Sequence, residues 1–413
     1  MKLLLLGGAL LFFGGLFAPK HRAPERYTFL ISGSAEGNLA PCGCTKPMSG
    51  GIKRKIAVIR ALGSKGKDVI ILENGGLVSG SSRQDEIKAE ILSESLRTVS
   101  VTAINLTRSE IGLGPAMVES MQRLSGEAFT SASFEGAPAP HKLSGPFLIV
   151  GVSDSGPETS QKYIPLSSAV EGALATAKEL NKRSILLLDG PIKTAETLAR
   201  TYPEIYMIVF RSTGAAASEP GRVGSTWLVS PGEKAKQLIQ VTGTAKTASK
   251  YSVIKLGPEV QDDEAAGRAY GRYLDRIVDE KLFERIPRGK TAEYVGSKAC
   301  ASCHAGAYEK WKQTGHAHAL KTLELDRHDR DPDCVSCHVV GMESLSGFMN
   351  REKTPELADV GCESCHGAGQ KHSADPKAYP FQKLGETACA TCHTPDTSPN
   401  FDFKTYWEKV IHN

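Results

Sequence analysis

The first two thirds of the sequence almost lack histidine, and the whole chain lacks a marked excess of either charge. His141 is the only histidine between Tyr27 and Pro287, so a site built from several imidazole ligands is not expected there. Lys and Arg number 50 against 46 Asp and Glu, a formal charge of +4 that gives no reason to expect a nucleic-acid partner. A length of 413 residues indicates two or three domains.

An apolar run from Leu3 to Phe17 follows a single positive charge at Lys2. The run is shorter than the about 20 residues of a spanning helix, and it contains four glycines. It is typical of a secretory signal peptide, residues 1–18, cleaved near Ala18; an uncleaved membrane anchor is the alternative. No cysteine follows the run to accept a lipid. We therefore expect a periplasmic or extracellular bacterial protein that is not membrane-associated after cleavage.

One pentapeptide pattern recurs four times in the last third of the chain. Two cysteines separated by two residues are followed directly by histidine, a C-x-x-C-H pattern in which the thiols form thioethers with haem and the imidazole ligates the iron. A zinc ribbon or a redox C-x-x-C would not require that histidine each time. The sequence predicts four haem c groups. Their attachment cysteines are Cys300, Cys303, Cys334, Cys337, Cys362, Cys365, Cys389 and Cys392, and their proximal histidines are His304, His338, His366 and His393.

Histidine is concentrated in this same region, where nine of the eleven lie between His304 and His412. Each of four irons has a place for a sixth ligand, so we expect four irons with two histidines each. Methionine is the competing ligand type, and Met342 and Met349 lie in range. The histidines that remain for the distal side are His316, His318, His328, His372 and His412.

Between Tyr27 and Gly257 short apolar runs alternate with amphipathic segments, which predicts an α/β domain, residues 27–257, with a layered αββα arrangement. Trp227–Ser230 and Gln237–Thr242 are expected to form a closing antiparallel pair. The other expected strands are Tyr27–Ser32, Asp68–Glu73, Phe147–Val152, Ser184–Leu188 and Tyr206–Phe210. The expected helices are Ile52–Leu62, Gln84–Thr98, Ala169–Asn181 and Thr194–Arg200.

Residues 258–290 are strongly charged, with apolar residues at a helical spacing. Tyr270, Tyr273, Ile277 and Phe283 would form one apolar face, which predicts a connecting helix packed between two domains. Residues 294–413 show little helical or strand periodicity. That is expected of a mostly irregular, partly α-helical multihaem cytochrome domain, in which haems replace side chains as the core.

The C-terminal region resembles the cytochrome c-554 family of tetrahaem electron carriers. The resemblance implies single-electron transfer through closely stacked haems, most of them with two histidine ligands. It also implies His316, His372 and His412 as distal ligands. His318, or alternatively His328, is left for the fourth iron, which some relatives leave five-coordinate. The stretches that carry the resemblance are Tyr294–His304, Trp311–Ala317, Cys334–Gly341, Gly361–His372 and Phe401–His412.

The N-terminal domain resembles the metallophosphoesterase domain of the 5′-nucleotidase family, in a version fused to multihaem cytochromes. The matching stretches are Phe29–Cys44, Gly50–Gly51, Ile70–Gly80 and Ile185–Gly190. The family's ligands are replaced at several points: by Ser34 and Glu36 after the first strand, by Gly75–Gly76 after the second, by Thr107–Glu110 in place of Gly-Asn-His-Glu, and by Phe210–Gly214, which has no histidine. A two-metal hydrolase needs several histidine and aspartate ligands. We expect a degenerate scaffold without phosphoesterase activity.

Several other residues leave alternatives open. Glu36, Glu110 and Asp189 could form a carboxylate cluster, but we expect them to be solvated and not to converge. The basic run Lys53–Lys55 is expected to be an exposed helix start. Cys42 and Cys44 could form a strained disulfide, remain free thiols or bind a metal; a disulfide is the first expectation in an exported protein.

Three functions fit the sequence. The favoured one is a multihaem cytochrome that passes single electrons between redox partner proteins, in respiratory or extracellular electron transfer, with a non-catalytic N-terminal scaffold or docking module. The second is a multihaem oxidoreductase in which one open iron acts on a small nitrogen or sulfur oxyanion. The third is a subunit of a polymeric cytochrome filament, formed by self-association.

Overall fold

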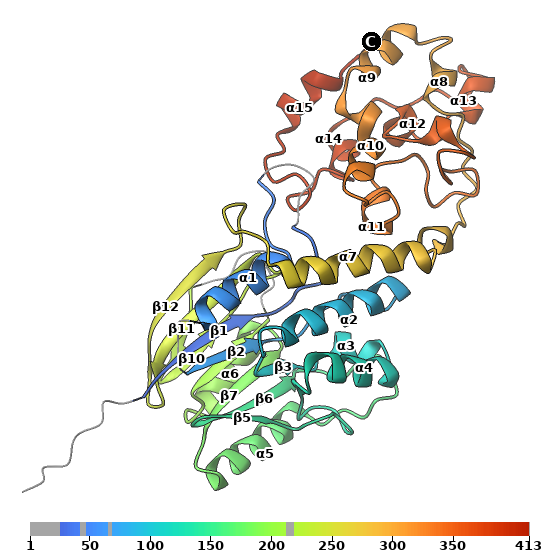
Figure 1. Cartoon of the computed structure of the whole chain (residues 1–413). Coiled ribbons are helices and arrows are strands. Elements are labelled where there is room, and N and C mark those ends of the chain that lie inside the picture. The colour runs from blue at the N-terminus through green and yellow to red at the C-terminus, as the bar shows by residue number, and fades with distance from the viewer. Residues whose placement is uncertain (1–24, 42–46, 65–67, 212–218, 413) are drawn as a thin grey trace, which may run out of the picture.

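The computed structural model describes residues 25–41, 47–64, 68–211 and 219–412 (Figure 1). The expected signal peptide and the Cys42 and Cys44 pair lie outside the described residues. Figure 1 shows a layered α/β part, the N-terminal domain, and a part built of short helices, the C-terminal domain. The long helix α7 (Glu264–Asp279) lies between them.

The first sheet has the strand order β12-β11-β1-β2-β3-β4. Its central strand β1 is buried on both faces, as its continuous apolar run predicts for a parallel strand. The parallel strands are β1 (Arg26–Ser32), β2 (Val69–Glu73), β3 (Ala103–Asn105) and β4 (Phe129–Thr130). The hairpin of β11 (Gln237–Thr244) and β12 (Ala248–Lys255) extends the sheet antiparallel to β1.

The second sheet has the order β5-β6-β7-β8-β10-β9. Its inner strands are β6 (Phe147–Ser153), β7 (Arg183–Asp189), β8 (Met207–Phe210) and β10 (Thr226–Val229), all parallel. The edges are β5 (Lys142–Ser144) and β9 (Gly221–Val223), each antiparallel to its neighbour.

The expected pairing of β10 with β11 is wrong. β10 adds to β8 in the second sheet, whereas β11 pairs with β1 and β12 in the first. β12 follows β11 after a short turn, and this hairpin gives β11 its antiparallel partner. The segment between β10 and β11 therefore crosses from one sheet to the other.

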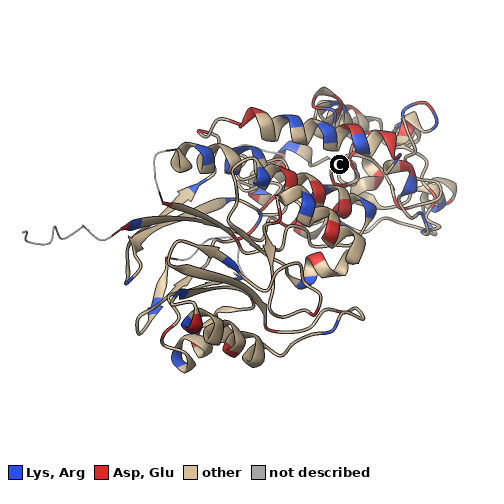
Figure 2. Ribbon diagram, turned by 60° about the horizontal axis from the view of Figure 1, so that its bottom comes forward, with Lys and Arg blue, Asp and Glu red and all other residues tan. Residues whose placement is uncertain are grey.

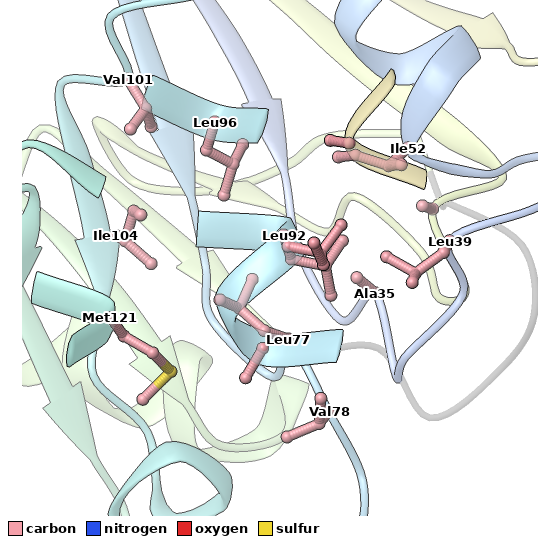
Figure 3. Close-up of a cluster of buried hydrophobic side chains, with 14 of the residues drawn as sticks. Ala35, Leu39, Ile52, Leu77, Val78, Leu92, Leu96, Val101, Ile104 and Met121 are labelled. Atoms are coloured by element: carbon pink, nitrogen blue, oxygen red, sulfur yellow. The ribbon is translucent and has the colours of Figure 1, made fainter. Parts of the chain in front are cut away.

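Three apolar cores hold these layers together. Phe29, Phe147 and Tyr206 lie between the two sheets, with ring centres 5.0–6.0 Å apart. Outside the first sheet, α1 (Ile52–Gly63), α2 (Arg83–Arg97), α4 (Pro115–Ser125) and α7 share a second core (Figure 3). Helices α5 (Leu166–Glu179) and α6 (Ile192–Thr201) cover the second sheet. The predicted αββα arrangement is confirmed.

The C-terminal domain has a small apolar core at one side only. Phe283, in the 3₁₀ turn η1 (Phe283–Arg285), packs there with Leu320, Val335 and Phe348. The other elements are α8 (Ser297–Cys300), α9 (Ala305–Lys312), η2 (Gly315–His318), α10 (Ala319–Leu325), α11 (Pro332–Val335), η3 (Pro355–Leu357), α12 (Cys362–His366), α13 (Gln370–Ala374), α14 (Glu386–Ala390) and α15 (Phe403–Val410). Helices α9, α13, α14 and α15 bury none of their own residues.

Candidate functional site

Each C-x-x-C-H motif lies on or beside one turn of helix. The backbone N–H of His304 donates to the Cys300 carbonyl at 2.9 Å, and His393 does the same to Cys389. Residues three and four apart lie on one face of a helical turn. Each motif therefore presents two sulfurs and one imidazole on the same side, as attachment to a single haem requires.

The structure pairs three of the four motif histidines with a second histidine. The ring centres lie 6.2 Å apart in His304–His372, 6.1 Å apart in His316–His393 and 5.9 Å apart in His366–His412. Two metal–nitrogen bonds of about 2 Å, plus the radius of each ring, place two imidazoles roughly 6 Å apart across one metal ion. The three pairs have the spacing that one iron between two imidazoles needs.

The protonation of these histidines also suits iron. Burial lowers the pKa of His316, of His366 and of His393, which favours the neutral imidazole that ligates metals. His372 and His412 each donate Nδ1–H to a backbone carbonyl at 2.9 Å. That bond leaves Nε2 free as a ligand and fixes the orientation of the ring, as is usual for a metal-binding histidine. The side chains present therefore fit covalently attached, histidine-ligated haem.

His338, the histidine of the second motif, is placed differently. Its Nδ1–H donates to the Ala319 carbonyl at 2.7 Å, so its Nε2 is also available. No other histidine ring stacks on it within the described part of the chain. His328 instead lies against Tyr270, with 2.7 Å between its Nε2 and the tyrosine hydroxyl, and the side chain of His318 is exposed. The structure brings neither candidate for the fourth distal ligand into ring contact with His338.

Sulfur atoms of different motifs adjoin one another. A hydrogen bond with the Cys300 thiol lowers the pKa of Cys362, which joins the first and third motifs. A hydrogen bond with Cys392 likewise lowers the pKa of Cys337 and joins the second motif to the fourth. With haem attached, these sulfurs would be thioethers and would not titrate. The pKa shifts therefore show only that the sulfur atoms lie close together.

The third and fourth motifs adjoin in the same way. Burial raises the pKa of the Cys365 thiol, and the nearby Cys389 adds to the rise. The motifs thus follow one another in space in the order first, third, fourth, second.

Asp189 is buried and not solvated as expected, and it meets two arginines from the replaced ligand positions of the N-terminal domain. Asp189, at the end of β7, is 1% exposed and accepts from Arg108 at 3.0 Å and from Arg211 at 3.1 Å. Two guanidinium groups therefore supply the positive charge at this edge. Among the described residues there is no group of three His, Cys, Asp or Glu side chains that could hold a metal ion.

Glu110 is also buried and not solvated. It forms a capping box at the start of α3 (Arg108–Gly112), where it accepts from the Thr107 N–H at 3.0 Å, and it accepts from the Leu77 N–H at 2.6 Å. Burial raises the pKa of Glu110, although these hydrogen bonds oppose the rise. Its role here is structural. Glu36, the third carboxylate, is half-buried.

The basic run at the start of α1 is not exposed as expected. Lys55 is completely buried and forms an ion pair with Glu73, which is buried as well, and Arg54 donates to the Met48 carbonyl at 2.7 Å. A buried lysine needs such a partner because an unpaired buried charge is very costly. In the sequence, Glu73 at the end of the apolar strand β2 was the feature that could have indicated a buried partner for Lys55.

Comparison with known proteins agrees with the haem geometry. Residues 299–367 match the family described as "Cytochrome c554 and c-prime". The C-terminal region is therefore similar to the cytochrome c-554 family over these residues. Cytochrome c-554 of Nitrosomonas europaea is 32% identical over 136 residues, covering 25% of this chain and 58% of the relative. The C-type polyheme cytochrome OmcB of Geobacter sulfurreducens is 33% identical over 88 residues, which cover 20% of this chain and 12% of that relative. The resemblance to a c-type, haem-binding cytochrome is confirmed.

Solved structures resemble the N-terminal domain in fold. The 5′-nucleotidase precursor of Thermus thermophilus aligns with a TM-score of 0.54 at 14% identity, covering 73% of this chain and 68% of the other. The sulfate thiohydrolase SoxB of Thermus thermophilus gives 0.52 at 17% identity, with 61% of each chain covered. The calcineurin-like phosphoesterase YfkN of Bacillus subtilis aligns with a TM-score of 0.51 at 12% identity, covering 62% of this chain and 98% of the other. The fold of the metallophosphoesterase-like domain is confirmed.

Proposed function

We propose that the protein is an exported electron carrier with four haem c groups in its cytochrome c-554 domain. The observation that carries the proposal is the three histidine pairs, each centred on a different C-x-x-C-H motif. The small apolar core adds support, because α9, α13, α14 and α15 bury none of their own residues and need another partner to pack against. When bound, each haem iron would accept and release one electron.

The residues of the domain hold and order these groups. His304, His366 and His393 are the proposed proximal ligands opposite His372, His412 and His316, respectively. The adjoining sulfurs favour a path that runs from the first haem through the third and fourth to the second. Acidic and basic residues are interspersed along the helices (Figure 2), so charge does not select one class of redox partner.

The second motif favours an additional role. His338 has no histidine ring stacked on it among the described residues, so we propose that its iron keeps one side open. An open iron can bind a small molecule, which retains the second candidate function, an oxidoreductase of a small nitrogen or sulfur oxyanion.

Export is proposed from the N-terminal apolar run. None of the described helices is long and apolar enough to cross a membrane. We expect the mature protein in the periplasmic or extracellular fraction. Recovery only with the membrane after salt washing would instead favour the uncleaved anchor.

We propose that the N-terminal domain is a scaffold without hydrolytic chemistry. The full-length protein, supplied with manganese or zinc, should hydrolyse neither nucleotides nor simple phosphate esters, because Arg108, Arg211 and Glu110 are committed to internal contacts. Turnover above a metal-only blank that is lost in Arg108→Ala, a variant of the converged edge, would contradict this.

The haem number is tested by the intact mass of the exported holoprotein, produced in cells with a working haem attachment system. The expected mass is that of the mature chain plus four haems. A homogeneous product with three or fewer would contradict the proposed set of attachment sites.

A further inference from the structure

One group of contacts between the two domains lies on the segment that leads into the second haem motif. A separate group joins Lys234 and Lys236 to Asp396, beyond the fourth motif. Asp331 accepts from the Gln84 side chain at 2.8 Å and from the Tyr273 hydroxyl at 2.9 Å, which places α2 and α7 directly against it. Lys88 of α2 forms an ion pair with Asp333. Side chains of α2 and α7 thus contact the residues immediately before Cys334.

Lys88 and Asp331 are largely withdrawn from water, whereas Asp333 is exposed. Lys88 is 7% exposed and Asp331 is 5% exposed, while Asp333 keeps 59% of its side chain in solvent. A charge acts more strongly where water does not screen it.

The charged group is tied to the haem-attachment turn by backbone bonds. Asp331 is the N-cap of α11, and its carbonyl accepts from the N–H groups of Cys334 and Val335 at 3.0 Å. Burial raises the pKa of the Tyr270 hydroxyl, on α7, and the nearby Asp331 and Cys334 add to the rise. The interface and the second attachment site therefore form one continuous structure.

We propose that Lys88, with Asp331 and Asp333, sets the reduction potential of the haem bound at Cys334 and Cys337, so that the N-terminal domain tunes one haem of the four. Reduction of the iron takes up one electron from a one-electron donor, and no bond forms or breaks. The ferric form carries one more positive charge than the ferrous form. Negative charge nearby therefore favours the ferric form and lowers the potential, and positive charge does the reverse.

This inference rests on the proposed haem at the second motif, and a pair of opposite substitutions tests it. Lys88→Met removes the cation and should lower the potential of one haem. Asp333→Asn, a nearly isosteric change at a half-exposed position, should raise the potential of that same haem. The equilibrium constant for reduction should change by about threefold to tenfold in each case, where tenfold corresponds to about 59 mV for one electron.

The measurement is a redox titration of the full-length holoprotein, followed by haem absorbance and by the spin state of the oxidised iron. The reduction potentials of three of the four one-electron steps should stay unchanged in each variant. The double variant, Lys88→Met with Asp333→Asn, should return the fourth step close to its starting value, since it restores the net charge. Lys162→Met is the matched control, because Lys162 has an ion-pair partner at 2.5 Å but is 72% exposed and lies in the N-terminal domain.

Two results would overturn the proposal. One is a shift in the same direction for both single variants, which would indicate structural disturbance. The other is the absence of any shift in Asp333→Asn. Failure of the haem assignment itself would appear separately, as a missing haem in the intact mass before any titration.

Discussion

Replacing Cys334 and Cys337 together with serine should yield a protein that carries three haems and has a markedly less stable C-terminal domain. Serine cannot form the thioether bonds, so the second haem loses both covalent links. The attachment turn lies against the small apolar core, where Cys334 packs with Val335 and Leu320. Binding free energy of a structural group is folding free energy, so we expect a loss above about 4 kcal/mol.

The mass of the intact variant and its thermal unfolding, followed by haem absorbance, check this result. Ser336→Ala is the matched control, since Ser336 stands between the two cysteines and is exposed. The control should keep four haems and unfold like the unmodified protein. A double serine variant that still carries four haems would show that the second motif is not an attachment site.

Replacing His412 with alanine should convert one low-spin iron to high-spin. His412 faces His366 with ring centres 5.9 Å apart. The other imidazoles near His366, those of His304 and His372, are paired with each other. The high-spin share of the oxidised iron should therefore rise from about one quarter to about one half. Carbon monoxide should then bind two of the reduced haems in place of one.

His328→Ala is the comparison for this variant. His328 is held by Tyr270 at 2.7 Å, so its loss should leave the high-spin share unchanged. Electron paramagnetic resonance with spin quantification measures both proteins. An unchanged spectrum for His412→Ala, or a new high-spin signal in His328→Ala, would reassign the distal ligands.

The layered fold could be predicted because its signals are local. The strand β1 is a continuous apolar run, and α1 and α2 carry their apolar residues at helical spacing. The pairing of β10 and β11 could not be predicted, because both are short apolar segments and either sheet can accept them. Only the hairpin of β11 with β12 assigns β11 to the first sheet.

The C-x-x-C-H motifs can be read from the sequence because they are contiguous, whereas the buried ion pairs join residues far apart in the chain. Arg108 and Arg211 stand where the resembling family has metal ligands, and two arginines there were the available signal for an internal ion pair with Asp189. Nothing in the sequence around Lys88 indicates that it is buried in an ion pair. Its partner Asp333 lies 245 positions away, so its burial depends on how two domains dock.

The surroundings of His338, the proposed ligand of the second haem, depend on three-dimensional structure in the same way. Sequence favoured His318 or His328 for this place, because five histidines were available for four irons. The contact between His328 and Tyr270 joins the C-terminal domain to α7. No sequence pattern near either residue predicts this contact. The expectation of four irons with two histidines each therefore gives way to the proposal of three such irons and one open iron.

Spin quantification of the oxidised, full-length holoprotein tests this account most directly. We expect about three quarters of the iron to be low-spin, from the pairs His304–His372, His316–His393 and His366–His412, and about one quarter to be high-spin at His338. Carbon monoxide should bind one of the four reduced haems. Entirely low-spin iron that binds no carbon monoxide would contradict the open fourth site, and high-spin iron at half or more of the total would contradict the three histidine pairs.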